Sequence, residues 1–323
     1  VGTDTIRNGT FFFKRNVGES GMDQLSLMCR DTDFPPMSLD IYATPGAKIK
    51  VTGTNPLIYT WRVDSPVKEQ QEHNRFIEDS RDLWDEFQRL AIKERSMRSA
   101  SEAERKALRT KSDSISSIIN QRELKLMKEL PISNVWMEKL LRLSMSLKYN
   151  SRFTNKEEIL ALYDRLNEEQ KASIEGQEIR VNLFPPKTVK EGDDMADADL
   201  FDLDGKVHHL ADFKGKYMLL DFWSSGCGPC IMALPEMKEI QEQYKDRLTI
   251  ISLSSDTQTR WKAASTQHEM TWQNLSDLKQ TAGLYAVYDV NGIPNYVLIS
   301  PKGKIVKMWS GYGKGSLKLK MRR

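Results

Sequence analysis

The sequence predicts a multi-domain chain in which a small antiparallel β domain and a helical middle region precede a C-terminal α/β domain. Three observations predict this architecture. Up to residue 64, short segments of β-forming residues alternate with turn residues. Between residues 65 and 186, apolar side chains recur at the three- and four-residue spacing of amphipathic helices. After residue 199, strand-like and helix-like segments alternate, which predicts a sheet with helices on both of its faces.

The composition excludes several classes of protein. The 323 residues leave room for about two domains or more. Three cysteines are too few for a scaffold built from disulfides, and four histidines leave few ligands for structural zinc. The net charge of +3 comes from basic and acidic residues that interleave along the chain, so we expect no nucleic-acid partner. No apolar run approaches the roughly 18–20 residues of a membrane span.

The β domain is expected over residues 1–64 as a small antiparallel sheet or sandwich. Asn8-Gly9 predicts a hairpin turn, because both residues tolerate a positive φ. Pro45-Gly46 predicts a second turn. The chain begins with Val1 and not with Met, so we expect the domain to lack its first strand here. Strands are expected in four short runs: residues 10–13, 25–29, 37–42 and 48–52. Cys29, at the end of one run, is expected to be a small buried side chain.

The helical region is expected over residues 65–186. One apolar stripe predicts a single helix through Phe76 and Leu90, and a second stripe predicts a helix through Ile115 that stops at Pro131. The charged stretch 95–114 between them has few apolar residues, and we expect an exposed connection there. A third helix is expected over 134–147. A capping box at Thr154–Glu157 predicts the start of a fourth.

A polar linker is expected over residues 187–198, followed by the α/β domain over 199–323. Asp204-Gly205 predicts a hairpin turn near its start. The run 217–223 is apolar except for Asp221, which is typical of a central strand buried on both faces. The remaining elements are helices over 229–244, 258–269 and near Leu284, and strands over 248–253, 296–299 and 304–308.

The chemistry of the chain is expected at Cys227-Gly228-Pro229-Cys230. Zinc would need four ligands, and the third cysteine lies about 200 residues earlier. A redox pair needs a buried strand before it and a helix that starts at it, and Pro229 stands where proline favours a first helical turn. The unpaired N–H groups of that turn would stabilise a thiolate on Cys227, which would attack a substrate disulfide. Cys230 would then attack the mixed disulfide. An inert pair of thiols or a static disulfide is the alternative.

Asp221 is the second notable residue, because a carboxylate inside an apolar strand is expensive to bury without a partner. Either it is a neutral or proton-shuttling group near Cys230, or it is a partly exposed carboxylate at the strand end.

Two segments resemble the thioredoxin fold and its active site. Residues 221–230, with Pro235 beyond them, are similar to the active-site segment of thioredoxins, and Gly292-Ile293-Pro294 is similar to their cis-proline loop. Residues 210–216, 234–237 and 299–305 are similar to TlpA/ResA-type thiol–disulfide oxidoreductases of the bacterial cell envelope. A β domain followed by helices and a thioredoxin unit resembles a multi-domain version of that family.

The resemblance implies a thioredoxin-like fold over 199–323 and an enzyme that exchanges thiols and disulfides with protein substrates. Cys227, Cys230 and Asp221 would be catalytic, and the main chain of Ile293 beside a cis Pro294 would pair with the substrate. Gly228, Pro229 and Trp223 would complete the site. No cofactor or metal is implied beyond the Cys227–Cys230 disulfide.

The family further implies a reductant in the periplasm or cell envelope of a bacterium, supplied with electrons by a membrane thiol donor. A membrane tether before Val1 and a homodimer are additional expectations. The alternative function is a binding or chaperone-like envelope protein that uses the thioredoxin unit as a recognition surface. A peroxidase-like relative would normally place its cysteine where Cys230 stands, at the second position of the motif. Gly226 and Asn295 depart from the family pattern, which usually has Trp and Thr at those positions.

Overall fold

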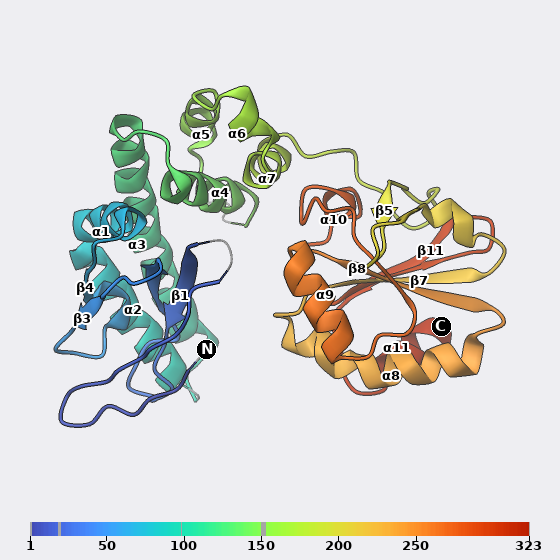
Figure 1. Ribbon diagram of the computed structural model, residues 1–323, viewed down its shortest axis with the longest axis horizontal. Coiled ribbons are helices and arrows are strands. Elements are labelled where there is room, and N and C mark those ends of the chain that lie inside the picture. Colours follow the sequence, from blue (N-terminus) through green and yellow to red (C-terminus); the bar gives the residue numbers. More distant parts are fainter. Residues whose placement is uncertain (1, 19–20, 98, 150–152, 323) are drawn as a thin grey trace. The chain divides into compact units, whose positions relative to one another are not determined.

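The computed structural model describes residues 2–18, 21–97, 99–149 and 153–322, and its chain forms two compact units that divide between Arg165 and Leu166 (Figure 1). Each unit has its own hydrophobic core. The division into domains at residues 64, 186 and 198 stays a prediction. None of the helices in these ranges is both long enough and apolar enough to cross a membrane.

The second unit is built on a five-stranded mixed sheet with the strand order β11-β10-β7-β8-β9. The central strand β7 pairs in parallel with β8 and antiparallel with β10. The strands of this sheet are β7 (Tyr217–Trp223), β8 (Leu248–Ser254), β9 (Gln273–Leu275), β10 (Asn295–Ile299) and β11 (Ile305–Ser310). A separate hairpin pairs β5 (Leu200–Phe201) with β6 (Val207–His208). The helices are α6 (Glu168–Ala172), α7 (Ile174–Leu183), α8 (Gly228–Tyr244), α9 (Gln258–Gln267), α10 (Leu284–Val287) and α11 (Ser316–Arg322), with a 3₁₀ turn η2 (Leu210–Phe213).

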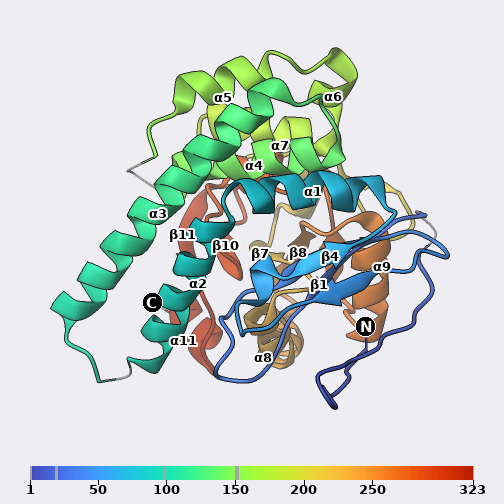
Figure 2. The ribbon, with the colours of Figure 1, turned by 90° about the vertical axis from the view of Figure 1, so that its left-hand side faces the viewer.

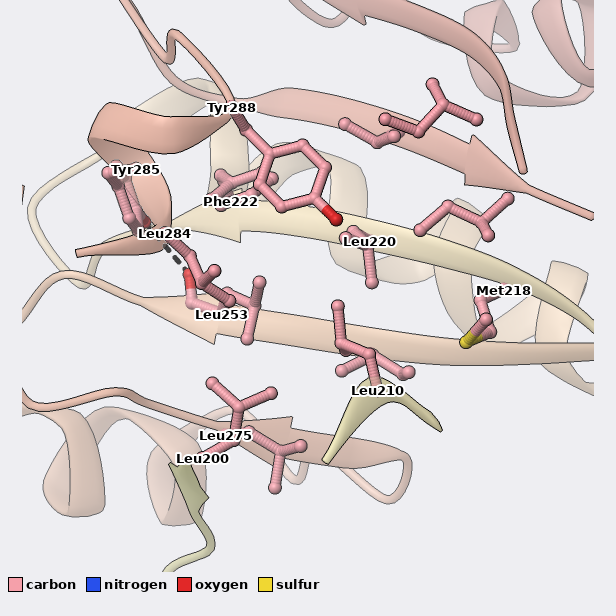
Figure 3. Close-up of a cluster of buried hydrophobic side chains, with 14 residues drawn as sticks. Leu200, Leu210, Met218, Leu220, Phe222, Leu253, Leu275, Leu284, Tyr285 and Tyr288 are labelled. Carbon is pink, nitrogen blue, oxygen red and sulfur yellow. Dashed lines mark hydrogen bonds between the residues drawn. The ribbon is translucent and has the colours of Figure 1, made fainter. Parts of the chain in front are cut away.

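Alternate residues of β7 face two different cores, as expected for a strand buried on both faces. Met218, Leu220 and Phe222 face the side of the sheet that α10 covers, and Figure 3 shows Tyr285 and Tyr288 against this row. The Tyr285 hydroxyl also donates a 2.9 Å hydrogen bond to the carbonyl of Leu253 (Figure 3).

The opposite face of the sheet packs against α8 and α11 (Figure 1). Its core combines residues of the sheet with apolar side chains of the two helices: Leu219, Leu234, Met237, Ile240, Tyr296 and Leu317. Helices therefore cover both faces of the sheet, which confirms the predicted α/β architecture. The predicted strand 217–223 is confirmed residue for residue, whereas the short edge strand β9 was not predicted.

The first unit contains two separate two-stranded antiparallel sheets and five helices in its described part. The strands are β1 (Asp23–Leu27), β2 (Leu39–Ala43), β3 (Lys50–Thr52) and β4 (Arg62–Asp64), with a 3₁₀ turn η1 (Ile58–Thr60). The helices are α1 (Lys68–Asp79), α2 (Arg81–Ser96), α3 (Glu102–Glu129), α4 (Asn134–Tyr149) and α5 (Lys156–Tyr163). In Figure 2, α2 and the long helix α3 lie side by side, and Leu90, Ile115 and Ile119 share one core.

The predicted hairpin turn at Asn8-Gly9 is confirmed, because Arg7 bridges Thr10 and both turn residues have positive φ. The aromatic run that follows it, residues 11–13, forms no strand. Strands β1, β2 and β3 overlap three predicted runs, and β4 was not predicted.

Three expectations for the helical region are wrong. The first predicted helix is two helices, since Ser80 leaves the helical conformation between α1 and α2. The expected connection 95–114, of which Arg98 lies outside the described residues, is mostly the first half of α3. A capping box between Ser101 and Glu104 starts α3, and helix formers such as alanine, leucine and lysine sustain it without an apolar stripe. The predicted capping box of α5 is absent, because Asn155 is the N-cap and its side chain accepts no hydrogen bond.

Candidate active site

The two cysteines of the motif meet at the N-terminus of α8. Strand β7 ends at Trp223, and helix α8 begins at Gly228 with a proline in its first turn. Cys227 is the N-cap residue and forms a disulfide with Cys230. Cys227 is half-buried, whereas Cys230 is only 2% exposed. The pair therefore consists of one cysteine that solvent reaches and one that the protein encloses.

The loop that carries Cys227 is held by a carboxylate from the neighbouring strand end. Asp256, which follows β8, accepts hydrogen bonds from the main-chain N–H of Ser225 at 2.6 Å and from its hydroxyl at 3.0 Å. Asp256 also accepts a hydrogen bond from Ser254 at 3.2 Å. Gly226, between this anchor and Cys227, is exposed.

Asp221 lies in the middle of β7 and is 2% exposed. The hydroxyl of Ser252, the residue opposite it on β8, donates a 2.7 Å hydrogen bond to its Oδ2. Burial raises the pKa of Asp221 to about 7, and the Ser252 hydrogen bond acts in the opposite direction. The alternative of a partly exposed carboxylate at the strand end is therefore wrong.

Trp223 closes the interior side of the cysteine pair. It is buried with Cys230, Trp261 and Ala264 in one apolar cluster. Its indole N–H has no hydrogen-bond partner among the described residues. Trp223 is thus part of the core under the disulfide.

The predicted cis-proline loop lies against the same cluster. The Ile293–Pro294 peptide bond is cis, as the resemblance implied. Ile293 is half-buried and packs against the cluster of Trp223 and Cys230, while Pro294 is buried. Within the described ranges, the N–H of Ile293 donates no main-chain hydrogen bond and its C=O accepts none. The fold thus brings together residues about 65 positions apart in the sequence.

The histidines near this unit's first hairpin are paired with aspartates. Nε2 of His208 lies 2.9 Å from Asp202, and Nε2 of His209 lies 2.9 Å from Asp199. Within the part of the chain that the structure describes, no three His, Cys, Asp or Glu side chains are grouped to hold a metal ion.

Parts of the chain are similar to known proteins. The family model described as AhpC/TSA matches residues 192–308. The thioredoxin-like protein YneN of Bacillus subtilis is 31% identical over 121 residues, which are 36% of this chain and 69% of that protein. The thiol–disulfide oxidoreductase ResA of Geobacillus thermodenitrificans is 32% identical over 139 residues, which are 42% of this chain and 79% of ResA. The chain belongs to the thioredoxin-like thiol–disulfide oxidoreductases.

Two solved structures of this enzyme family are also similar to the chain. One is the thioredoxin domain of a thiol–disulfide oxidoreductase from Bacteroides vulgatus, 28% identical, with 42% of this chain and 99% of that chain covered and a TM-score of 0.38. The other is a thiol:disulfide interchange protein from Bacteroides sp., 31% identical, with coverages of 37% and 81% and a TM-score of 0.35.

Four further residues lie at this site that the sequence analysis did not single out. Ser252 and Trp272 form a hydrogen-bonded chain to Asp221, Asp256 holds the loop before Cys227, and Trp261 packs beside Cys230. Ser252 carried a signal, because it is a polar residue inside an apolar strand, as Asp221 is. The positions of the other three depend on where the chain places α9 and the segments that follow β8 and precede β9, which the sequence does not reveal.

Asn295, the departure after Pro294, is buried in β10. Its Nδ2 donates a 2.8 Å hydrogen bond to the Ser310 hydroxyl on β11. Asn295 thus joins the end of the cis-proline loop to the edge strand of the sheet.

Proposed function

We propose that this oxidoreductase reduces disulfides of protein substrates in a bacterial cell envelope, through Cys227 and Cys230. One observation carries the proposal: a disulfide joins a half-buried N-cap cysteine to a buried one at the N-terminus of α8, beside the Ile293–Pro294 loop. The N–H groups of a helix N-terminus favour an anion, and a thiolate is the nucleophile of disulfide exchange.

The reaction starts from the reduced dithiol. The Cys227 thiolate attacks one sulfur of a substrate disulfide, the substrate S–S bond breaks, and one substrate thiolate leaves. Cys230 then loses its proton and attacks Sγ of Cys227. The mixed disulfide breaks, the second substrate thiolate leaves, and the Cys227–Cys230 disulfide forms. Two electrons pass from the enzyme to the substrate.

Asp221 is the proposed acceptor of the Cys230 proton. It lies on the same face of β7 as Trp223, which packs against Cys230. Its pKa near 7 lets a carboxylate take up a proton and return it at neutral pH. Glycine and proline as the two residues between the cysteines support the direction of reduction, with a potential nearer to about −270 mV than to −120 mV.

The Ile293–Pro294 loop is the proposed docking site for the substrate chain. The N–H and C=O of Ile293, which make no main-chain hydrogen bond within the described part of the chain, suit an extended segment that pairs as a β-strand. Half-buried apolar side chains pack, as Cys227 does, against the cluster of Trp223 and Cys230, and they favour apolar residues next to the substrate cysteine: Leu203, Ile231, Met270 and Ile293.

The envelope location and a membrane thiol donor rest on the resemblance to TlpA/ResA-type proteins. A membrane tether and a homodimer are further parts of this proposal, and they rest on the same resemblance. The two relatives match only 36% and 42% of the chain. We therefore assign the alternative function, binding of a partner protein, to the part of the chain that they do not match.

Trapping with Cys230→Ser in a Cys29→Ala background tests the proposal. The variant should hold substrates from an envelope extract on Cys227 through a disulfide that dithiothreitol releases. The Cys227→Ser, Cys230→Ser double variant is the matched control and should hold none. Partners that stay bound after dithiothreitol, together with no reduction of a model disulfide by the wild type, would favour the binding function instead.

A further inference from the structure

A chain of buried polar side chains leads to Asp221 across two neighbouring strands. Nε1 of Trp272, just before β9, donates a 2.8 Å hydrogen bond to Oγ of Ser252 on β8. The Ser252 hydroxyl donates the next hydrogen bond, of 2.7 Å, to Oδ2 of Asp221. Ser252 is fully buried, and Trp272 and Asp221 are nearly so.

The donors and acceptors of these three side chains fix the direction of both hydrogen bonds. An indole N–H only donates, so Ser252 must accept from Trp272. A hydroxyl has one proton, and in the described part of the chain Ser252 donates it to Oδ2 of Asp221. Oδ2 therefore receives a hydrogen bond in both protonation states of the carboxyl group. A proton that arrives at Asp221 is left with the other oxygen, Oδ1.

We propose that Ser252, held by Trp272, is a positioning residue that keeps Oδ2 of Asp221 occupied and makes Oδ1 the atom that exchanges a proton with Cys230. The proton exchange with Cys230 rests on the function proposed above. The orientation of the carboxyl group does not, because it follows from the hydrogen bonds alone. A hydroxyl that accepts one hydrogen bond also donates a stronger one, so Trp272 strengthens the contact of Ser252 with Asp221.

The other ionisable groups around Asp221 come from three elements. Tyr296 on β10 lies opposite Asp221 in register, and Tyr285 of α10 is coupled to it electrostatically. Glu236 comes from α8, and its charge reaches Tyr296. Cys230 of the same helix packs against Trp223, which lies on the same face of β7 as Asp221. Burial raises the pKa of both tyrosines above their ordinary value, so neither tyrosine titrates with Asp221. Glu236 accepts hydrogen bonds from the N–H groups of Gly315 and Lys318.

Ser252 stabilises the ionised form of Asp221 against the effect of burial. Ser252→Ala should therefore raise the pKa of Asp221 by about one to two units, the usual effect of losing a hydrogen bond to a charged group. Ser252→Thr keeps the hydroxyl and should hold the pKa near that of the wild type. Trp272→Phe keeps an aromatic ring and removes the N–H, so we expect a smaller rise.

The test is a pH titration of the oxidised protein, labelled with ¹³C at the aspartate carboxyl groups. The Asp221 signal is the one that Asp221→Asn removes. Ser265→Ala is the matched control, since Ser265 is also a buried, hydrogen-bonded serine of this unit but makes its contacts with Trp261 and Asn274. This control should leave the Asp221 titration unchanged.

The proposal fails if Ser252→Ala leaves the Asp221 pKa within about 0.3 units of the wild type, or if Ser265→Ala shifts it equally. A role in packing alone would lower stability without moving the titration. If Ser252→Ala does not fold, Ser252→Thr and Trp272→Phe are compared instead. The proposal is then overturned if both variants raise the Asp221 pKa equally, by about one unit.

The titration needs no turnover, so it separates this proposal from the one above. A wild type that reduces no disulfide but shows the Ser252→Ala shift would refute the proposed function and leave the orientation of Asp221 standing. In an active enzyme, the pH midpoint for release of the mixed disulfide should move upward with Ser252→Ala. In the Asp221→Asn background the same substitution should have no effect on that midpoint.

Discussion

The main-chain N–H of Cys230 donates a hydrogen bond to Sγ of Cys227 across 3.2 Å. Cys227 thus caps α8 through its sulfur, at the position where serine or aspartate usually accepts this bond. A sulfur in this position has the positive end of the helix dipole beside it. In the reduced enzyme the same geometry would favour the thiolate of Cys227.

The first prediction is that the pKa of the reduced Cys227 lies well below the value of about 8.5 for a free cysteine. Cys227 would be studied alone in the Cys29→Ala, Cys230→Ser variant. The rate of alkylation by iodoacetamide, measured against pH, should have its midpoint at least about one unit below the free value. The Cys29→Ala, Cys227→Ser variant, which leaves the buried Cys230, should react far more slowly. A midpoint of about 8.5 for the alkylation of Cys227 would show that the helix N-terminus does not lower the pKa of its thiol.

The second prediction concerns the cost of burying Asp221. Its pKa is about 7 in the folded protein against an ordinary value of 3.8, because burial disfavours the charged form. Between these two pH values the folded chain binds one more proton than the unfolded chain, so stability falls as pH rises through that window. Asp221→Asn has no such group and should be more stable than the wild type at pH 8, by up to about 4 kcal/mol.

Urea denaturation of the oxidised proteins at pH 4 and pH 8 measures this effect. The gain of Asp221→Asn should almost vanish at pH 4, where Asp221 is neutral in the folded state. A gain of the same size at both pH values would mean that packing, and not ionisation, causes it.

In an assay of insulin reduction, Asp221→Asn should slow release of the mixed disulfide and leave Cys227 alkylation nearly unchanged.

The sequence alone allowed the prediction of every strand of the second unit's five-stranded sheet except β9, and of its cysteine pair. Each β7 residue is apolar except Asp221, and the motif starts its helix with a proline, so local pattern and tertiary role agree. The neighbours of Asp221 were not predictable, because strand order decides them. Ser252 lies next to Asp221 only because β8 pairs with β7 in parallel at this register.

The first unit was harder to predict, because its structure depends on capping and side-chain contacts. Half of the residues in the first half of α3 are charged, so its hydrophobic pattern is weak there. Reciprocal hydrogen bonds between Ser101 and Glu104 start this helix. The short sheets of this unit also depend on individual side-chain hydrogen bonds. The side chain of Gln70 in α1 accepts a hydrogen bond from the main chain of Tyr42 at the edge of β2. No periodicity in the sequence indicates such a contact.

The third prediction is that Asp256 keeps the loop before Cys227 in its reactive position. Asp256→Ala leaves the N–H and hydroxyl of Ser225 without their acceptor. The rate of disulfide reduction should fall about ten-fold or more, since small misplacements of reacting groups have effects of this size. Ser225→Ala removes only the hydroxyl contact and should have a smaller effect. Equal rates for Asp256→Ala and the wild type would show that the loop holds its position without this carboxylate.

The fourth prediction compares two glutamates of α8 that both contact α11. Glu236 is 6% exposed and accepts hydrogen bonds from the N–H of Gly315 at 2.9 Å and of Lys318 at 3.0 Å. Glu239 forms an exposed ion pair with the Lys318 ammonium at 2.6 Å. Glu236→Gln keeps only one acceptor oxygen for two donors, so it should destabilise the protein by about 1–3 kcal/mol. Glu239→Gln should have little effect, because solvent screens an exposed pair.

Hydrogen exchange of the α11 amides, together with urea denaturation, separates the two roles. In Glu236→Gln the amides of α11 should exchange faster than those of β7, because α11 loses its anchor while the sheet keeps its core. Leu317, which α11 inserts into the core below the sheet, should then become accessible as well. Equal destabilisation by the two substitutions would mean that the charge of α8, and not the two main-chain hydrogen bonds, holds α11 in place.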